Sequence, residues 1–161
     1  MKRFITVMVC AVIALFYTDV VTAQTNASAT VTANVLSTLQ VTNLAGNQIL
    51  DFGDVSPVST ETIPFSSGVD FRISGASNVP VVVTFTAPTE LTGPGAPIGF
   101  TAEFEGSETN IIGSTSSVVS GAERTLNADG NHFLWLGGEI TVGNVLPGTY
   151  SGTFTVTVAY P

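Results

Sequence analysis

The sequence predicts an all-β fold, an immunoglobulin-like β-sandwich of about seven to nine strands. Short segments of alternating apolar and polar residues recur along the chain, and clusters of Gly, Pro, Asn and Asp separate them. No long segment has the periodicity of an amphipathic helix. Short strands at such spacing, joined by turns, are typical of an immunoglobulin-like sandwich.

The N-terminus has the pattern of a secretory signal peptide. Met1, Lys2 and Arg3 form a positive start, residues 4–16 are an uncharged apolar run, and small residues precede Ala23. We therefore expect residues 1–23 to be a cleaved signal peptide and residues 24–161 to be a single β-sandwich domain. A retained signal anchor is the alternative, but the run is shorter than the roughly 20 residues that span a bilayer.

Charge and cysteine content narrow the function of the expected mature chain. The single cysteine, Cys10, lies within the apolar run, so residues 24–161 have no thiol for disulfides or cysteine chemistry. Arg72 and Arg124 are the cations that remain, against 11 acidic residues, which gives a net charge of −9. Nucleic-acid binding and attachment to an anionic membrane both need clustered basic residues, so neither is expected. We also expect no membrane insertion after signal cleavage.

The first predicted strand covers residues 27–35, where every second residue is apolar and Ser, Thr and Asn lie between. Leu39 and Val41 extend this strand or begin the next one. Residues 45–47 read as a turn, and residues 50–53 as a short strand or edge.

Three alternating segments follow, at residues 69–73, 79–85 and 100–104. Turn-forming residues separate the first two, and a Pro-rich loop precedes the third. Pro80 indicates an edge strand or a strand start, because proline donates no hydrogen bond to a neighbouring strand.

The C-terminal third begins with a predicted hairpin turn at residues 128–131, which contain Asp-Gly. Residues 133–136 are apolar on both faces and are followed by Gly137-Gly138, which we interpret as a β-bulge. The last segment, residues 150–160, has the most regular alternation in the chain and predicts one strand.

No residue pattern predicts catalysis, a cofactor or a metal site. His132 is the only histidine; it follows the Asp-Gly turn, where we expect it to be exposed, and no serine lies in a nucleophile motif. Glu103, Glu105 and Glu108 read as a solvated acidic face, because no calcium-loop residues surround them. Trp135 lies in an apolar strand and is expected in the core rather than at a sugar-stacking surface. We therefore expect no enzyme.

Both ends of the chain resemble subunits of chaperone–usher pili. The penultimate residue is the aromatic Tyr160, and Gly148 is the fourteenth residue counted back from the C-terminus, as in the last strand of such subunits. The likeness is closest to major subunits of colonisation-factor-type fimbriae, on the Thr/Val/Ala alternation after Ala27, on Gly46-Asn47 and on residues 147–152. The chain also resembles a broad family of secreted bacterial β-sandwiches of unknown function, on residues 50–53 and 148–158.

The pilin resemblance implies a cell-surface fimbrial subunit that polymerises by donor-strand exchange and supports adhesion. Residues 24–36 would be the donor segment, with these inward residues: Ala27, Ala29, Val31, Ala33 and Val35. The C-terminal strand would border the acceptor groove and engage a chaperone through Gly148, Tyr150, Phe154, Val156, Val158 and Tyr160. The implied partners are other copies of the chain or sister pilins, with a periplasmic chaperone and an outer-membrane usher during export.

A second interpretation remains open. The leading segment could pack on its own sandwich, which would make the protein a self-contained secreted surface or matrix module that binds protein or glycan without polymerising.

Overall fold

The computed structural model describes residues 30, 37–44, 46 and 48–161. It divides the chain into two units, Met1–Asn34 and Val35–Pro161. Thr30, which is exposed, is the one described residue of the first unit. All the strands reported below belong to the second unit. No helix among the described residues is long and apolar enough to cross a membrane.

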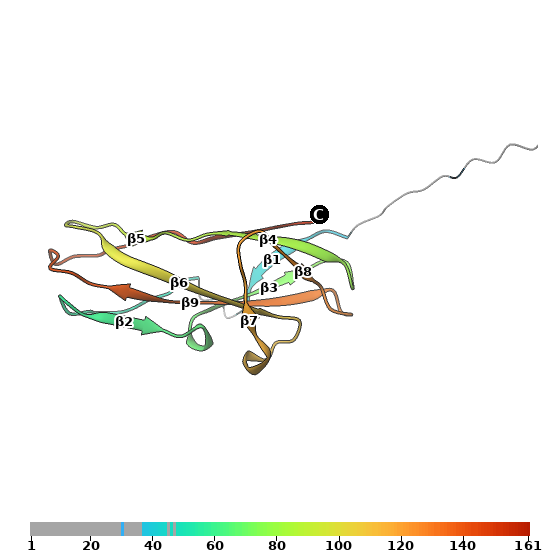
Figure 1. Ribbon diagram of the computed structural model, residues 1–161, viewed down its shortest axis with the longest axis horizontal. Coiled ribbons are helices and arrows are strands. Elements are labelled where there is room, and N and C mark those ends of the chain that lie inside the picture. Colours follow the sequence, from blue (N-terminus) through green and yellow to red (C-terminus); the bar gives the residue numbers. More distant parts are fainter. Residues whose placement is uncertain (1–29, 31–36, 45, 47) are drawn as a thin grey trace, which may run out of the picture. The chain divides into compact units, whose positions relative to one another are not determined.

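Two antiparallel sheets form the second unit (Figure 1). The larger sheet has the order β1 (Gln40–Asn43), β3 (Val69–Ser74), β9 (Asn131–Thr141), β6 (Ile98–Ser107) and β5 (Glu90–Leu91). In the same sheet β2 (Thr60–Ile63) also pairs with β9, and β7 (Ser116–Ser117) pairs with β6. The smaller sheet has the order β10 (Thr155–Ala159), β4 (Pro80–Thr86) and β8 (Ala122–Thr125). Two 3₁₀ turns, η1 (Phe65–Ser67) and η2 (Ile112–Ser114), complete the described elements.

The main core lies between the sheets, where the alternating apolar residues of facing strands meet. Val81 and Val83 of β4 are fully buried, as are Ile73 of β3 and Leu134 of β9. A second cluster forms around Ile98, Ile140 and Val142, with partly buried side chains packed against it. Because successive side chains of a strand point to opposite faces, the alternation in the sequence is what delivers these residues to one side of each sheet.

The sandwich predicted from the sequence is therefore confirmed. The described residues contain ten strands rather than seven to nine, and two of the ten, β5 and β7, are only two residues long. Pro80 begins β4, which is the central strand of its sheet. The sequence indicated either an edge strand or a strand start at Pro80, and the structure shows a strand start. Residues 50–53, predicted as a short strand, form none, and Gly53 there has a φ of +67°.

The predicted bulge at Gly137-Gly138 is wrong. The pairing of β9 with β6 continues without interruption through Gly137, opposite Glu103, and Gly138, opposite Ala102. A Cβ on Gly137 would lie 2.4 Å from the backbone nitrogen of Phe65. The glycine is required because η1 crosses directly over β9, at the point where the partner of β9 changes from β3 to β2.

The Asp-Gly turn at residues 128–131 is present but joins two sheets instead of forming a hairpin. It connects β8 of the smaller sheet to β9 of the larger one. The Asn127 side-chain oxygen accepts hydrogen bonds from the backbone N–H groups of Asp129 and Asn131, at 3.0 and 2.9 Å. Gly130 has a φ of +74°, which a residue with a side chain rarely adopts.

Candidate functional site

The candidate acceptor strand, β10, is an edge strand. Among the described residues it pairs with β4 on one side only. Val158 lies opposite Val83 and Val156 opposite Phe85 in this pairing. Val83 is fully buried, whereas Val156 and Val158 are each only partly buried although they pack against the same core. The described chain therefore covers the apolar face of β10 less completely than that of its neighbour.

Phe154 begins this incompletely covered surface. Its ring stacks on Phe85, with centroids 5.8 Å apart, and lies 5.3 Å from the ring of Phe104 on the facing sheet. Phe85 and Phe154 are partly buried, whereas Phe104 is 4 % exposed. The aromatic cluster therefore has a covered base on β6 and a partly open side at β4 and β10.

Tyr160 joins three parts of the chain through its hydroxyl group. The oxygen accepts a hydrogen bond from the backbone N–H of Ala76 at 2.9 Å, and the hydroxyl donates to the backbone carbonyl of Ser37 at 3.1 Å. Leu39 and Val41 also pack against the main core, and β1 lies next to β10. The penultimate aromatic residue thus fixes the chain at residue 37 against the C-terminal end.

The structure separates two predicted site residues from the rest, so the single strand predicted for residues 150–160 is wrong. β10 begins only at Thr155. Tyr150 packs in the second cluster, where its hydroxyl donates to the carbonyl of Leu146 at 2.9 Å. Gly148 has a φ of +151° and approaches Pro94 closely. The division arises because Ser151 pairs with Thr92, two positions out of register with the pairing of β10 and β4.

The predicted donor residues lie outside the described residues. They are Ala27, Ala29, Val31, Ala33 and Val35. Their role stays a prediction.

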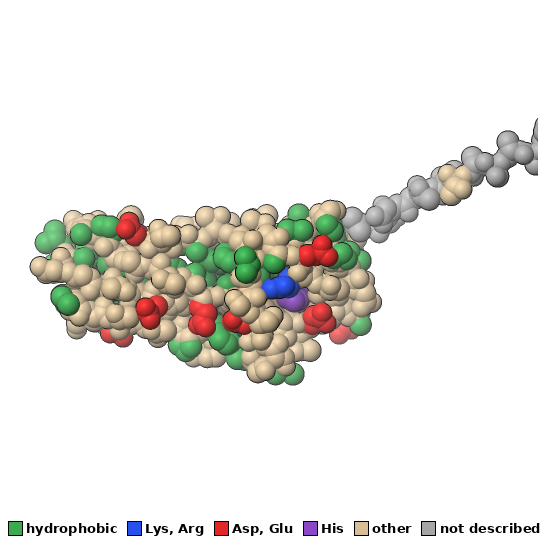
Figure 2. All heavy atoms as spheres, viewed as in Figure 1, with side chains coloured by type: hydrophobic (Ala, Val, Ile, Leu, Met, Phe, Trp, Pro, Cys, Tyr) green, Lys and Arg blue, Asp and Glu red, His purple; other side chains and the backbone are tan. Residues whose placement is uncertain are grey.

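A second candidate site surrounds His132, which the sequence placed at the surface. That expectation is wrong: His132 is 3 % exposed and lies in β9 beneath a pocket of about 590 Å³. The turn that precedes His132 leads the chain from the smaller sheet to the larger one, and this crossing places the imidazole ring in the interior of the protein. On this face the chain's single histidine lies beside a basic side chain with acidic side chains around them (Figure 2).

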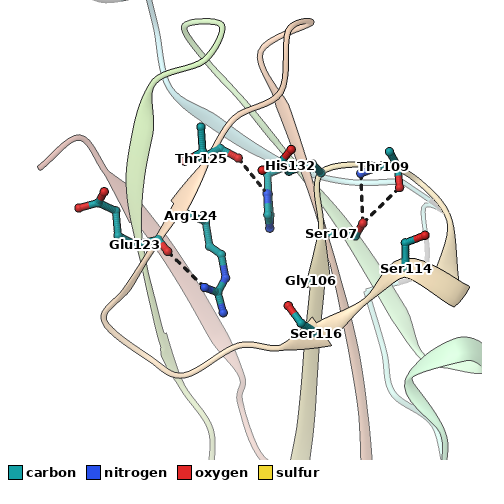
Figure 3. A pocket seen from close by; sticks show the side chains of 10 residues that line it. Gly106, Ser107, Thr109, Ser114, Ser116, Glu123, Arg124, Thr125 and His132 are labelled. Carbon is teal, nitrogen blue, oxygen red and sulfur yellow. Dashed lines mark hydrogen bonds between the residues drawn. The ribbon is translucent and has the colours of Figure 1, made fainter.

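The polar groups of this pocket come from β6, β7, β8, β9 and the loop after β6. Figure 3 shows the His132 ring and the Arg124 side chain extending into the same space. Arg124 donates hydrogen bonds to the backbone carbonyls of Ser117 and Glu123, at 3.0 and 3.3 Å. Five hydroxyl-bearing residues and two glutamates also line the pocket: Ser107, Thr109, Ser114, Ser116, Thr125, Glu108 and Glu123.

The protonation of His132 follows from its surroundings. Nδ1 lies 3.2 Å from the carbonyl oxygen of Thr125, which can only accept, so Nδ1 carries the proton. Burial lowers the pKa of His132 below its ordinary value of 6.5, with the nearby Arg124 acting in the same direction, while the Thr125 bond and Glu108 oppose this. The ring is therefore neutral at pH 7, and Nε2 is a hydrogen-bond acceptor.

Sequence reasoning missed this pocket because its residues are scattered and individually ordinary. Gly106 is the one feature that could have indicated it: a Cβ there would lie 3.1 Å from Nε2 of His132 and 2.8 Å from Val118. Glycine within a strand often marks such a close approach. The sequence alone gave no sign of which group approaches.

Comparisons with known proteins give a family without an assigned activity. None of the curated proteins searched matches the chain. A family model matches residues 53–160, which include every strand from β2 to β10 and exclude the predicted donor segment. The chain therefore belongs to the family described as a domain of unknown function, DUF4402.

Proposed function

We propose that this chain is a structural subunit of an exported cell-surface fimbria and that it assembles by donor-strand exchange. The observation that carries the proposal is the partial exposure of Val156 and Val158 on an edge strand whose neighbour, β4, is fully buried at Val81 and Val83. A strand added beside β10 would supply both hydrogen bonds and apolar side chains, which is the β-augmentation mode of recognition.

Burial of such a strand would contribute a large part of the subunit's stability. The five predicted inward side chains of the donor segment, three of which are alanine, would bury apolar surface in the groove. At about 25 cal/mol per Å², this burial would contribute on the order of 5 kcal/mol to stability. Total stability of a domain is about 5–15 kcal/mol. A subunit without this strand would be marginally stable. If each copy gives one strand and receives one, the contacts between copies are head-to-tail and do not close into a ring. The product is a filament.

Export and partners form part of the same proposal. A cleaved signal peptide at residues 1–23 would send the chain to the periplasm, where a chaperone would cover β10 until an usher replaced it with the donor segment of another copy. The protein would then reside on the cell surface and act without catalysis.

The experiment is a pair of substitutions in the donor segment. Val31→Asp places a charge on the predicted inward face, and Thr32→Asp places the same charge on the outward face. Material sheared from cells is run unheated in SDS. The proposal predicts a ladder of multimers for the unchanged chain and for Thr32→Asp, and its loss for Val31→Asp. Equal behaviour of the two variants would contradict it.

The self-contained module is the second candidate, and one observation favours it. Leu39 and Val41 already pack on the core of their own chain, and Ser37 bonds Tyr160. If the residues before them follow the same course, the chain would complete its own sandwich. Such a protein would give a stable monomer under every condition of the experiment above.

A further inference from the structure

The pocket around His132 contains two buried polar atoms of opposite kind for which the described residues offer no hydrogen-bond partner. One is Nε2 of His132, an acceptor in the neutral ring, and the other is the Nε–H donor of Arg124. A buried polar group without a hydrogen-bond partner destabilises the fold, because it loses its bonds to water and gains none in return. Two such groups at one pocket are a cost that a suitable ligand would remove.

A single hydroxyl group has the hydrogen-bonding capacity for both kinds of atom, because a hydroxyl can accept from an N–H and donate to a ring nitrogen at once. We propose that this pocket binds an uncharged polyhydroxyl ligand, a neutral saccharide unit, with one hydroxyl bridging Arg124 and His132. Both residues line the pocket, and both atoms are buried. Because both atoms are buried, binding requires a movement of the Arg124 side chain, whose guanidinium donates to two backbone carbonyls, that opens Nε–H and Nε2 to the ligand.

The rest of the lining favours the same class of ligand. None of the side chains that line the pocket is apolar, so a hydrophobic ligand would gain little. Glu108 and Glu123 stand at the pocket beside the one cation, and this mixed charge disfavours an anion. Their carboxylates accept hydrogen bonds from sugar hydroxyls, and the serine and threonine hydroxyls can donate or accept. The volume of about 590 Å³ lies within the range of small-molecule sites.

The pocket is separate from the proposed assembly edge. Arg124 lies on β8, which is the opposite edge strand of the three-stranded sheet from β10. A strand added at β10 would therefore leave the pocket in place, and saccharide binding does not depend on polymerisation.

The test is a titration of the isotopically labelled chain, followed by NMR. The neutral probes are galactose, glucose, mannose and N-acetylglucosamine, and the charged probes are N-acetylneuraminic acid and inorganic phosphate. We expect at least one neutral sugar to give saturable shifts at Gly106, Ser107 and His132. Ser116→Trp, which fills the pocket from an exposed position, should abolish them, and Arg124→Met should weaken binding about tenfold, the value of one hydrogen bond.

Ser117→Trp is the matched control, because Ser117 is exposed, adjacent to Ser116 and directed to the other face of β7. It should bind like the unchanged chain. The inference is overturned if no neutral sugar gives saturable shifts, if a charged probe is preferred, or if Ser116→Trp binds as well as Ser117→Trp. A crystal grown with the sugar that shows only a water between Arg124 and His132 would also overturn it.

Discussion

The pair Val158 and Val83 allows the coverage of β10 to be measured as a free energy. The two valines lie opposite each other in the β10–β4 pairing, but β4 is also paired with β8 on its other side, whereas β10 has no second partner among the described residues. Val83 is fully buried, and Val83→Ala removes two carbon atoms from a packed site and leaves a cavity. At about 0.8 kcal/mol for each carbon plus the cavity, the cost is about 2–3 kcal/mol. Val158 is partly exposed, and the same substitution should cost about 1 kcal/mol in the monomer.

Urea-induced unfolding of purified monomers gives both values. Addition of a peptide with the sequence of residues 24–36 should then raise the cost of Val158→Ala to about 2 kcal/mol, because the added strand buries Val158. The cost of Val83→Ala should not change. If Val158→Ala already costs as much as Val83→Ala in the monomer, and the peptide changes nothing, then the edge is covered by its own chain and the reasoning fails.

Three further predictions concern stability. Tyr160→Phe should cost about 1–2 kcal/mol, measured by urea unfolding, because the N–H of Ala76 loses its acceptor; an unchanged midpoint would contradict this. Gly137→Ala should cost about 2–3 kcal/mol by the same assay, because its Cβ would meet the backbone of Phe65, and Gly113→Ala, where a Cβ meets nothing within 4 Å, is the control that should cost far less. Burial lowers the pKa of His132 in the folded chain, so the unfolded chain binds a proton on this ring at a higher pH than the folded chain does. The His132 ring should therefore leave the free energy of unfolding unchanged above about pH 6.5 and lower it as the pH falls below that value. His132→Phe should remove that part of the pH dependence, and an unaltered pH profile would refute it.

The sandwich could be predicted because local pattern determines most of it. The alternation at Val69, Phe71 and Ile73, or at Val81 and Val83, fixes which side of each strand faces the core, and the structure follows it. Local pattern does not determine which strands pair with each other. Nothing local distinguishes a turn that forms a hairpin from one that crosses between sheets, and this is why His132 was expected at the surface and is buried.

The candidate site was predictable only in part. Phe154, Val156, Val158 and Tyr160 could be identified by their alternation, and they do share one core. Tyr150 has the same spacing but belongs to another cluster, because a two-residue change of register near Ser151 breaks the strand. The pocket depends on side chains that meet from distant strands, and such meetings have no signature in a single sequence.

The central claim is that residues 24–36 complete the sandwich of another copy, and engineered cysteines test it most directly. No other cysteine is present in residues 24–161, so disulfides form only where they are placed. Thr157 is an outward-facing residue of β10, and Thr32 is an outward-facing residue of the predicted donor strand. The variant with cysteine at both positions is oxidised on the cell surface. A second variant, with cysteine at Thr30 instead of Thr32, tests the alternative register of the donor strand. The account predicts disulfide-linked multimers on non-reducing gels. Disulfide-bonded monomers in both registers, with no multimers, would contradict it.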